Sequence, residues 1–185
     1  MFSISWFITR GPRSDYARQH IRRLNEREGL RVAEIGVWRG NHAKTLQNQL
    51  DMEKMYVIDP YDAYKDYEES KSEVEKMRDA KKTAYDKLEP YDNIEWVELY
   101  SHQAAQQIDD QLDYVYIDGN HKYEYVKRDI ELFYELVKPG GIVAGHDFST
   151  GWPGVIQAVM EFSDEEEVEV NTELHGSDWW FKKPD

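Results

Sequence analysis

Two carboxylates and two histidines stand at the ends of apolar stretches of this sequence, where they could bind a metal ion or move a proton. Asp118 ends the apolar run at 114–117, His121 follows three residues later, and His146 and Asp147 end a second run. Two carboxylates that meet in one cleft suit Mg²⁺ or a similar hard cation. A histidine with an ordinary pKa of about 6.5 is mostly neutral at pH 7, so it can accept a proton.

The elements that must position these residues are short apolar strands that alternate with helices. We expect five such strands, at residues 31–35, 54–59, 93–99, 112–118 and 141–147. We expect helices between them at residues 41–50, 61–92, 101–108 and 123–137, a further helix at 153–162, and a terminal hairpin at 167–174 and 178–183. This alternation predicts an α/β fold with a doubly wound, mostly parallel sheet.

The polar residues of the sequence are expected to gather at one edge of that sheet. Because crossovers between parallel strands are right-handed, the carboxyl ends of the strands meet at one rim, where such folds bind ligands. The residues expected at this rim are Glu34, Gly36, Asp59, Ser101, His102, Asp118, His121, His146 and Asp147. Ionisable side chains collected at one edge of an apolar sheet indicate a binding or catalytic site there.

The composition narrows the class of protein further. With 185 residues and no internal repeat, we expect a single domain over residues 1–185. It comprises an N-terminal helical region at 1–30 and a long charged helix at 61–92, inserted after the second strand, in which 17 of 32 residues are charged. The net charge of −14 argues against nucleic acid as a partner. No secretion signal, cysteine or apolar run of about 20 residues is evident, so we expect a cytoplasmic protein without membrane contact.

A glycine-containing turn follows the first expected strand. Gly36 and Gly40 are spaced as G-x-x-x-G, and Trp38 stands where a dinucleotide-binding turn has the glycine that admits a pyrophosphate. A ligand without phosphates can still use such a turn and the start of the next helix. Asp59, at the end of the second strand, can bind two ribose hydroxyls. The pattern therefore favours a ribose-containing ligand over a purely structural turn.

Five segments give the sequence a family resemblance: VAEIGVWRGNHAKTL, MYVIDPY, LDYVYIDGNHKYEYVKRDI, LVKPGGIVAGHDF and PGVIQAVMEF. They resemble class I S-adenosylmethionine-dependent methyltransferases of the methyltransferase domain 24 type, in the branch of macrocin O-methyltransferase-like and cephalosporin hydroxylase-like proteins. The most specific part is the Asp-Gly-x-His-x-Tyr block with the later Pro-Gly-Gly and His-Asp. The resemblance runs from about Val32 to Lys182, and it implies a Rossmann-like, seven-stranded sheet whose last strand is antiparallel.

The resemblance also implies a cofactor, S-adenosyl-L-methionine, and the residues that would bind it. Those residues are Glu34, Gly36, Val37, Trp38 and Gly40 around the methionine part, Asp59 at the ribose hydroxyls, Pro60 and Tyr61 beside the adenine, Ser101 and His102 against its ring, and Asp118 close by.

A metal site and a catalytic base follow from the same resemblance. In sugar-modifying relatives, acids at the fourth and fifth strand ends hold a divalent metal, which implies a Mg²⁺ or Mn²⁺ site at Asp118, His146 and Asp147. Many relatives carry an acid in place of His146, and histidine prefers Mn²⁺, Fe²⁺ or Zn²⁺ to Mg²⁺. The metal would hold a substrate hydroxyl whose proton passes to His121, so His121 and Asp118 are the expected catalytic residues. Two simpler roles stay open: Asp118 as a helix cap and His121 as a surface residue.

These expectations combine into one activity with two alternatives. We expect an enzyme that methylates a hydroxyl of a sugar or small metabolite, and a homo-oligomer is compatible with the sequence. An aromatic residue near the rim, such as Trp152, could stack on the acceptor. The alternatives are a non-catalytic cofactor-binding module of the same fold and an NAD-type oxidoreductase, which Trp38 disfavours.

Overall fold

Seven strands form one mixed sheet in the computed structural model, which describes residues 19–62, 71–173 and 176–185. The strands are β1 Leu30–Ile35, β2 Met52–Ile58, β3 Ile94–Val97, β4 Leu112–Ile117, β5 Val137–Gly145, β6 Asn171–Thr172 and β7 Trp179–Lys182. They lie in the order β3-β2-β1-β4-β5-β7-β6. Strands β1 to β5 run parallel, and β7 is antiparallel to its neighbours β5 and β6. The predicted mostly parallel, seven-stranded sheet with an antiparallel last strand is confirmed.

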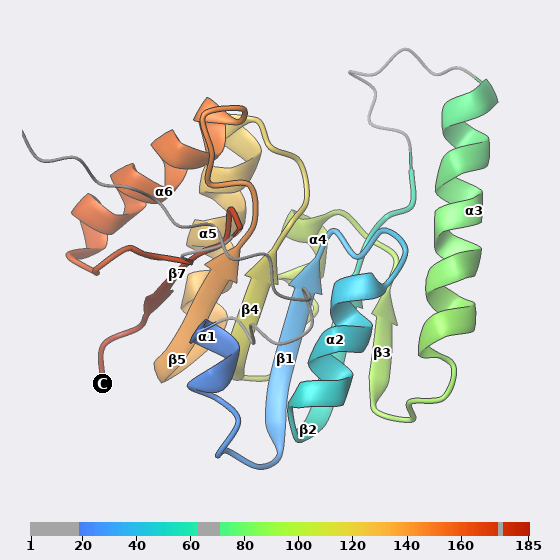
Figure 1. Ribbon diagram of the computed structural model, residues 1–185, viewed down its shortest axis with the longest axis horizontal. Helices are drawn as coiled ribbons and strands as arrows, with labels where there is room; N and C mark the ends of the chain where they lie inside the picture. The colour runs from blue at the N-terminus through green and yellow to red at the C-terminus, as the bar shows by residue number, and fades with distance from the viewer. Residues whose placement is uncertain (1–18, 63–70, 174–175) are drawn as a thin grey trace, which may run out of the picture.

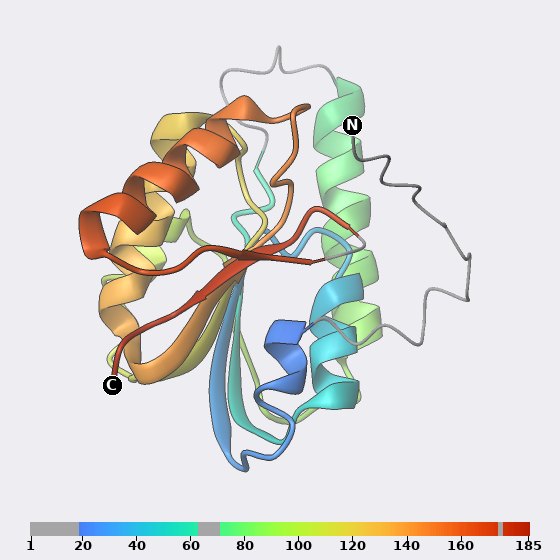
Figure 2. The same ribbon diagram turned by 60° about the vertical axis from the view of Figure 1, so that its left-hand side comes forward.

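Helices cover both faces of this sheet (Figure 1). They are α1 Gln19–Arg22, α2 Asn41–Gln49, α3 Lys71–Leu88, α4 Ser101–Ala104, α5 Tyr123–Leu136 and α6 Pro153–Glu166. Figure 2 shows α1, α2 and α3 on one side of the sheet and α5 and α6 on the other. The two buried clusters agree with this division, because one contains side chains of α1 to α3 and the other side chains of α4 to α6. The expected winding on both faces is therefore confirmed.

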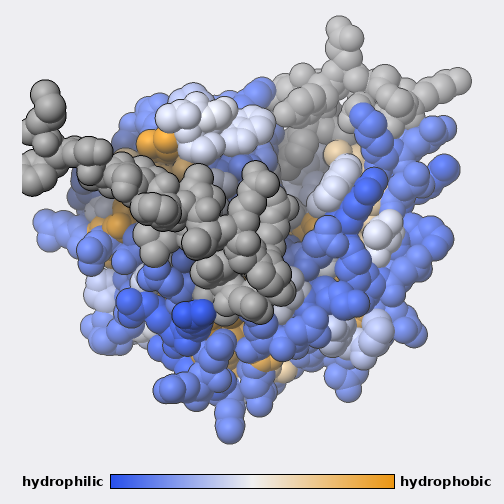
Figure 3. Space-filling view, in the orientation of Figure 1, coloured by the Kyte–Doolittle hydropathy of each residue, from blue (hydrophilic) through white to orange (hydrophobic). Residues whose placement is uncertain are grey.

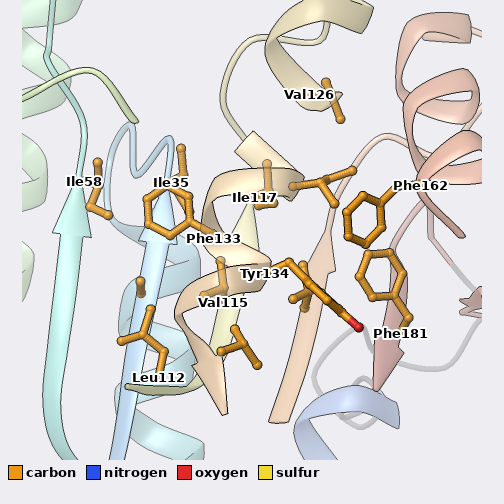
Figure 4. Close-up of a cluster of buried hydrophobic side chains, with 14 of the residues drawn as sticks. Ile35, Ile58, Leu112, Val115, Ile117, Val126, Phe133, Tyr134, Phe162 and Phe181 are labelled. Carbon is orange, nitrogen blue, oxygen red and sulfur yellow. The ribbon is translucent and has the colours of Figure 1, made fainter. Parts of the chain in front are cut away.

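One of the two cores joins β1 and β4 to α5 and α6 (Figure 4). Ile35 and Ile117, the last residues of β1 and β4, belong to this core together with Phe133 of α5. Phe133 is fully buried, and burying such a ring stabilises a fold by about 2 kcal/mol. The packing fixes α5 against the sheet, and it thereby fixes the strand ends that lead into the loops of the rim.

Several helices differ from their predicted boundaries. Helix α4 ends at Ala104 rather than at residue 108. Helix α3 ends at Leu88 rather than at residue 92, and Pro90 stands just beyond this end. At the other end of the predicted helix, Tyr61 has a left-handed φ of 48° and is not helical, and residues 63–70 lie outside the described residues. Helix α3 lies in the crossover between β2 and β3. Helix α6 extends to Glu166, past the predicted end. Within the described part of the predicted N-terminal helical region, only the single turn of α1 is helical.

The surface is mostly hydrophilic on the face that Figure 3 shows, as a charged fraction of 32% leads one to expect. Among the described residues, no helix has the length and apolar character that a membrane span requires. Two large exposed aromatic side chains, Trp38 and Trp152, lie in the segments that follow β1 and β5. They therefore border the carboxyl ends of the strands.

Candidate functional site

The order of the strands reverses between β1 and β4, which are neighbours although β2 and β3 separate them in the sequence. Sheets of this type bind ligands at such a switch point, outside the carboxyl ends of the strands. A cavity of about 290 Å³ opens there. Six of the residues predicted to bind a cofactor line it: Gly36, Trp38, Asp59, Pro60, Ser101 and Asp118.

The turn after β1 runs tightly against the end of β4. Gly36 has a φ of 83°, and a Cβ added there would lie 2.1 Å from the backbone oxygen of Asp118. The Gly36 N–H donates a hydrogen bond to the carbonyl of Ile58, at the end of β2, over 2.9 Å. Glycine is therefore required at this position, and its backbone joins the ends of three strands at the cavity.

Asp59 holds two backbone segments beside the cavity. Its Oδ2 accepts a hydrogen bond from the Trp38 N–H at 2.9 Å, and its Oδ1 accepts one from the Tyr61 N–H at 2.8 Å. Burial raises the pKa of Asp59, whereas these backbone donors lower it. A carboxylate oxygen has two lone pairs, so Asp59 can also accept hydrogen bonds from a ligand in the cavity.

The remaining predicted cofactor residues are not among the described residues that line this cavity: Glu34, Val37, Gly40, Tyr61 and His102. Glu34 and Val37 are buried, and Glu34 Oε2 lies 3.2 Å from His42 Nδ1 on α2. Burial raises the pKa of Tyr61, and its hydroxyl has no hydrogen-bond partner in the described part of the chain.

A second group of side chains lies at the ends of β4 and β5. One ligand atom each of Asp118, His121 and Asp147 lies within 4.8 Å of the other two. His121 Nε2 is 2.6 Å from Asp147 Oδ2 and 3.6 Å from Asp118 Oδ1. Hydrogen bonding to Asp118 and the charge of Asp147 raise the pKa of His121, against burial, which lowers it. Two carboxylates and an imidazole at these separations can hold a divalent cation or a proton.

His146 has a different environment from the other predicted metal ligands. Its Nδ1 lies 3.1 Å from Asp147 Oδ1, and its Nε2 lies 3.3 Å from Ser177 Oγ and 3.7 Å from Asp178 Oδ1. The structure thus brings Asp118 and Asp147 together as expected, with His121 as the third member of the group. His146 contacts the outer side of Asp147, between that carboxylate and the loop before β7.

Trp152 stands beside the predicted base. Its ring stacks on the imidazole of His121, with 4.5 Å between the centroids and 26° between the planes. The indole is 43% exposed. This contact restricts the imidazole and leaves an aromatic surface next to it, on which a sugar or a planar acceptor could stack.

The sequence reasoning missed Asp129, which reaches the cavity from α5. The residue is 3% exposed, and its Oδ1 accepts a hydrogen bond from Ser101 Oγ at 2.5 Å. Burial raises the pKa of Asp129 to about 6, against the hydrogen bond from Ser101, which lowers it. The signal was present in the helical spacing, because Asp129 follows Val126 by three residues and precedes Ile130, both of them buried. A carboxylate on the buried face of a helix is uncommon unless it has a partner or a ligand.

Sequence comparison gives one family match. A family model described as a methyltransferase domain matches residues 33–148, which include the turn after β1 and both carboxylates of the second group. A search of curated proteins finds no significant match.

Solved structures share the fold at low sequence identity. The O-methyltransferase TomG from Streptomyces achromogenes, in complex with SAM, is 14% identical with a TM-score of 0.63, covering 89% of this chain and 76% of that one. The O-methyltransferase NovP is 15% identical with a TM-score of 0.63, over 90% and 79% of the two chains. An rRNA methylase from Streptococcus thermophilus is 13% identical with a TM-score of 0.62, over 90% and 93%. These neighbours act on different acceptors, so the shared fold does not select one.

Proposed function

The chain belongs to the methyltransferase family whose domain matches residues 33–148, and we propose that it transfers a methyl group from S-adenosyl-L-methionine to a hydroxyl oxygen of a sugar or other small metabolite. The main support for this proposal is that the cavity lined by Asp59 lies next to the group of Asp118, His121 and Asp147. Asp118 belongs to both. A cofactor in the cavity would therefore lie beside residues that can accept a proton.

The cavity suits the nucleoside part of this cofactor. Asp59 would accept hydrogen bonds from the ribose hydroxyls, since both of its oxygens retain acceptor capacity beside the cavity. Pro60 would border the adenine, and Gly36 would let the ligand approach the backbone. Glu34 and Val37 would act from behind by supporting the turn. When bound, the cofactor supplies a sulfonium methyl group that the acceptor oxygen can attack.

His121 would accept the proton of the acceptor hydroxyl as the new C–O bond forms and the C–S bond breaks. The resulting imidazolium would be stabilised by Asp147, 2.6 Å away, and by Asp118. Trp152 would hold the ring in place and present its exposed face to the acceptor. Much of the rate would come from holding the oxygen and the methyl carbon close together and in line.

A divalent cation, Mg²⁺ or Mn²⁺, fits the same three residues, because the carboxylates supply oxygen ligands and His121 a nitrogen. When bound, the cation would lower the pKa of the acceptor hydroxyl. His146 would orient Asp147 from outside. His121 Nε2 cannot be both a metal ligand and the base, so these two roles exclude each other.

We favour a small acceptor over RNA because the net charge of −14 would repel a phosphate backbone. The activity is tested with S-adenosyl-L-methionine that carries a labelled methyl group, a panel of sugars and glycosides, and added Mg²⁺, Mn²⁺ or chelator. The proposal predicts label in an ether product and release of S-adenosylhomocysteine. Cofactor binding without transfer to any acceptor would instead indicate a non-catalytic module of the same fold.

A further inference from the structure

Asp129 is a buried carboxylate in the cavity wall that has few partners among the described residues. Ser101 Oγ donates to its Oδ1 at 2.5 Å, and Arg128 Nε lies 3.8 Å from the same oxygen. Burial raises the pKa of Asp129 to about 6, so the group is ionised above that pH. A buried carboxylate lowers stability unless polar partners compensate it. The position of Asp129 in the cavity therefore points to a ligand.

The hydroxyl of Ser101 cannot itself donate to that ligand. A hydroxyl has one hydrogen, and that of Ser101 is directed to Asp129 Oδ1. At this part of the cavity wall, a ligand therefore meets a hydrogen-bond acceptor, the carboxylate of Asp129, and no free donor from Ser101.

Gly119 leaves the second oxygen of Asp129 accessible. A Cβ added to Gly119 would lie 3.8 Å from Asp129 Oδ2 and 3.5 Å from Ile35 Cγ2, which are ordinary contact distances. Gly119 and Asp129 both line the cavity. A methyl group at this position would therefore stand next to Oδ2 without a steric clash.

We propose that Asp129 Oδ2 accepts a hydrogen bond from the amino group of the cofactor's purine, and that this contact selects adenine over hypoxanthine. The inference rests on the proposed function, since it needs the adenosine in the cavity with its ribose at Asp59. Both Asp59 and Asp129 line that cavity, one from the end of β2 and the other from α5. The purine amino group is a donor, whereas the oxygen of hypoxanthine at the same position is an acceptor and would repel the carboxylate. A site with a buried polar group rejects an analogue that leaves this group unpaired.

The test is a calorimetric titration at pH 8 with S-adenosylhomocysteine and its inosyl analogue, S-inosylhomocysteine. The wild-type protein should bind the adenosyl ligand about tenfold more tightly or better. Asp129→Asn keeps an oxygen for Ser101 but presents an amide NH₂ to the cavity, so the preference should fall below about threefold. Gly119→Ala, which covers Oδ2, should also lower the preference for the adenosyl ligand. This variant tests the role of Asp129 if Asp129→Asn does not fold.

Asp59→Ala is the matched control, since it should weaken both ligands by the same factor and leave their ratio unchanged. Equal affinity of the wild-type protein for both ligands, or an unchanged ratio in the folded variants at Asp129 and Gly119, overturns the role of Asp129 and leaves the proposed function intact. Binding of neither ligand by the wild-type protein overturns the proposed function itself.

Discussion

The two halves of the site are built from different parts of the chain. The cavity beside β1, β2 and β4 is held by backbone: Gly36 lies against the backbone of β4, and Asp59 accepts two main-chain hydrogen bonds. The group of Asp118, His121 and Asp147 is held by contacts among partly exposed side chains. We therefore expect changes in the cavity to affect stability and cofactor affinity, and changes in the side-chain group to affect turnover.

The largest effect is expected at the turn after β1. Gly36→Ala places a Cβ 2.1 Å from the backbone oxygen of Asp118 and imposes a left-handed φ on alanine. The free energy of unfolding should fall by roughly 3–5 kcal/mol, with loss of S-adenosylhomocysteine binding. Urea denaturation and calorimetry measure both quantities. Gly151→Ala is the control, because its added Cβ has no neighbour closer than 3.6 Å; equal effects of the two substitutions would contradict the backbone account.

The next effect is the pH dependence of stability at Asp129. Its folded pKa of about 6 exceeds the ordinary value of 3.8, so between these pH values the folded protein binds more protons than the unfolded chain. The contribution of Asp129 to the free energy of unfolding is therefore fully present below about pH 4 and is lost as the pH rises through about 6. The two-unit difference corresponds to roughly 3 kcal/mol.

Asp129→Asn should therefore match the wild-type protein near pH 4 and exceed its free energy of unfolding by up to about 3 kcal/mol at pH 7. Urea denaturation at both pH values gives the comparison. Asp92→Asn, at an exposed carboxylate outside the cavity lining, is the matched control. A difference between Asp129→Asn and wild type that does not change with pH would show that the charge of Asp129 is not costly in the fold.

In the group of Asp118, His121 and Asp147, the substitution His121→Ala should lower kcat by about 100-fold, since a positioned base contributes at least this much to the rate. The affinity for S-adenosylhomocysteine should stay the same, because His121 is not among the described residues that line the cavity. Steady-state kinetics and calorimetry separate the two effects. Unchanged turnover, or a loss of cofactor binding equal to the loss of turnover, would contradict the division into two halves.

The smallest effect is expected at the exposed ring beside the base. Trp152→Leu removes the stacking on His121 and the aromatic surface offered to the acceptor, so KM for the acceptor should rise about three- to tenfold. Met160→Leu, at an exposed apolar position of α6, is the control. A KM for the acceptor that stays at the wild-type value would exclude Trp152 from acceptor binding.

The same contrast explains which parts of the site the sequence could predict. Strand ends and tight turns demand particular residue types, so Gly36 and Asp59 were recognisable from their positions after apolar runs. The sheet and its two helical layers followed from the alternation of strands and helices. These features depend on local backbone geometry, and that geometry can be predicted from the pattern of residue types in the sequence.

Side-chain direction and contacts from distant elements were harder to predict. His146 and Asp147 are adjacent, and only the left-handed φ of 61° at Asp147 and the contacts of His146 with Ser177 and Asp178 decide which one faces His121. Asp129 lies within an apolar helical face and meets Ser101 across 28 residues of sequence. Both contacts depend on tertiary packing. The helical spacing places Asp129 on the buried face of α5, but no local pattern identifies Ser101 as its partner.

The most direct test of the account is calorimetric titration of S-adenosylhomocysteine into the wild-type protein, Asp59→Ala and the control Asp92→Ala. The account predicts binding by the wild-type protein, the same affinity for Asp92→Ala, and at least about tenfold weaker binding for Asp59→Ala, because the ribose loses its charged acceptor. No binding by the wild-type protein, or equal binding by all three, would contradict a cofactor site in the cavity between β1, β2 and β4.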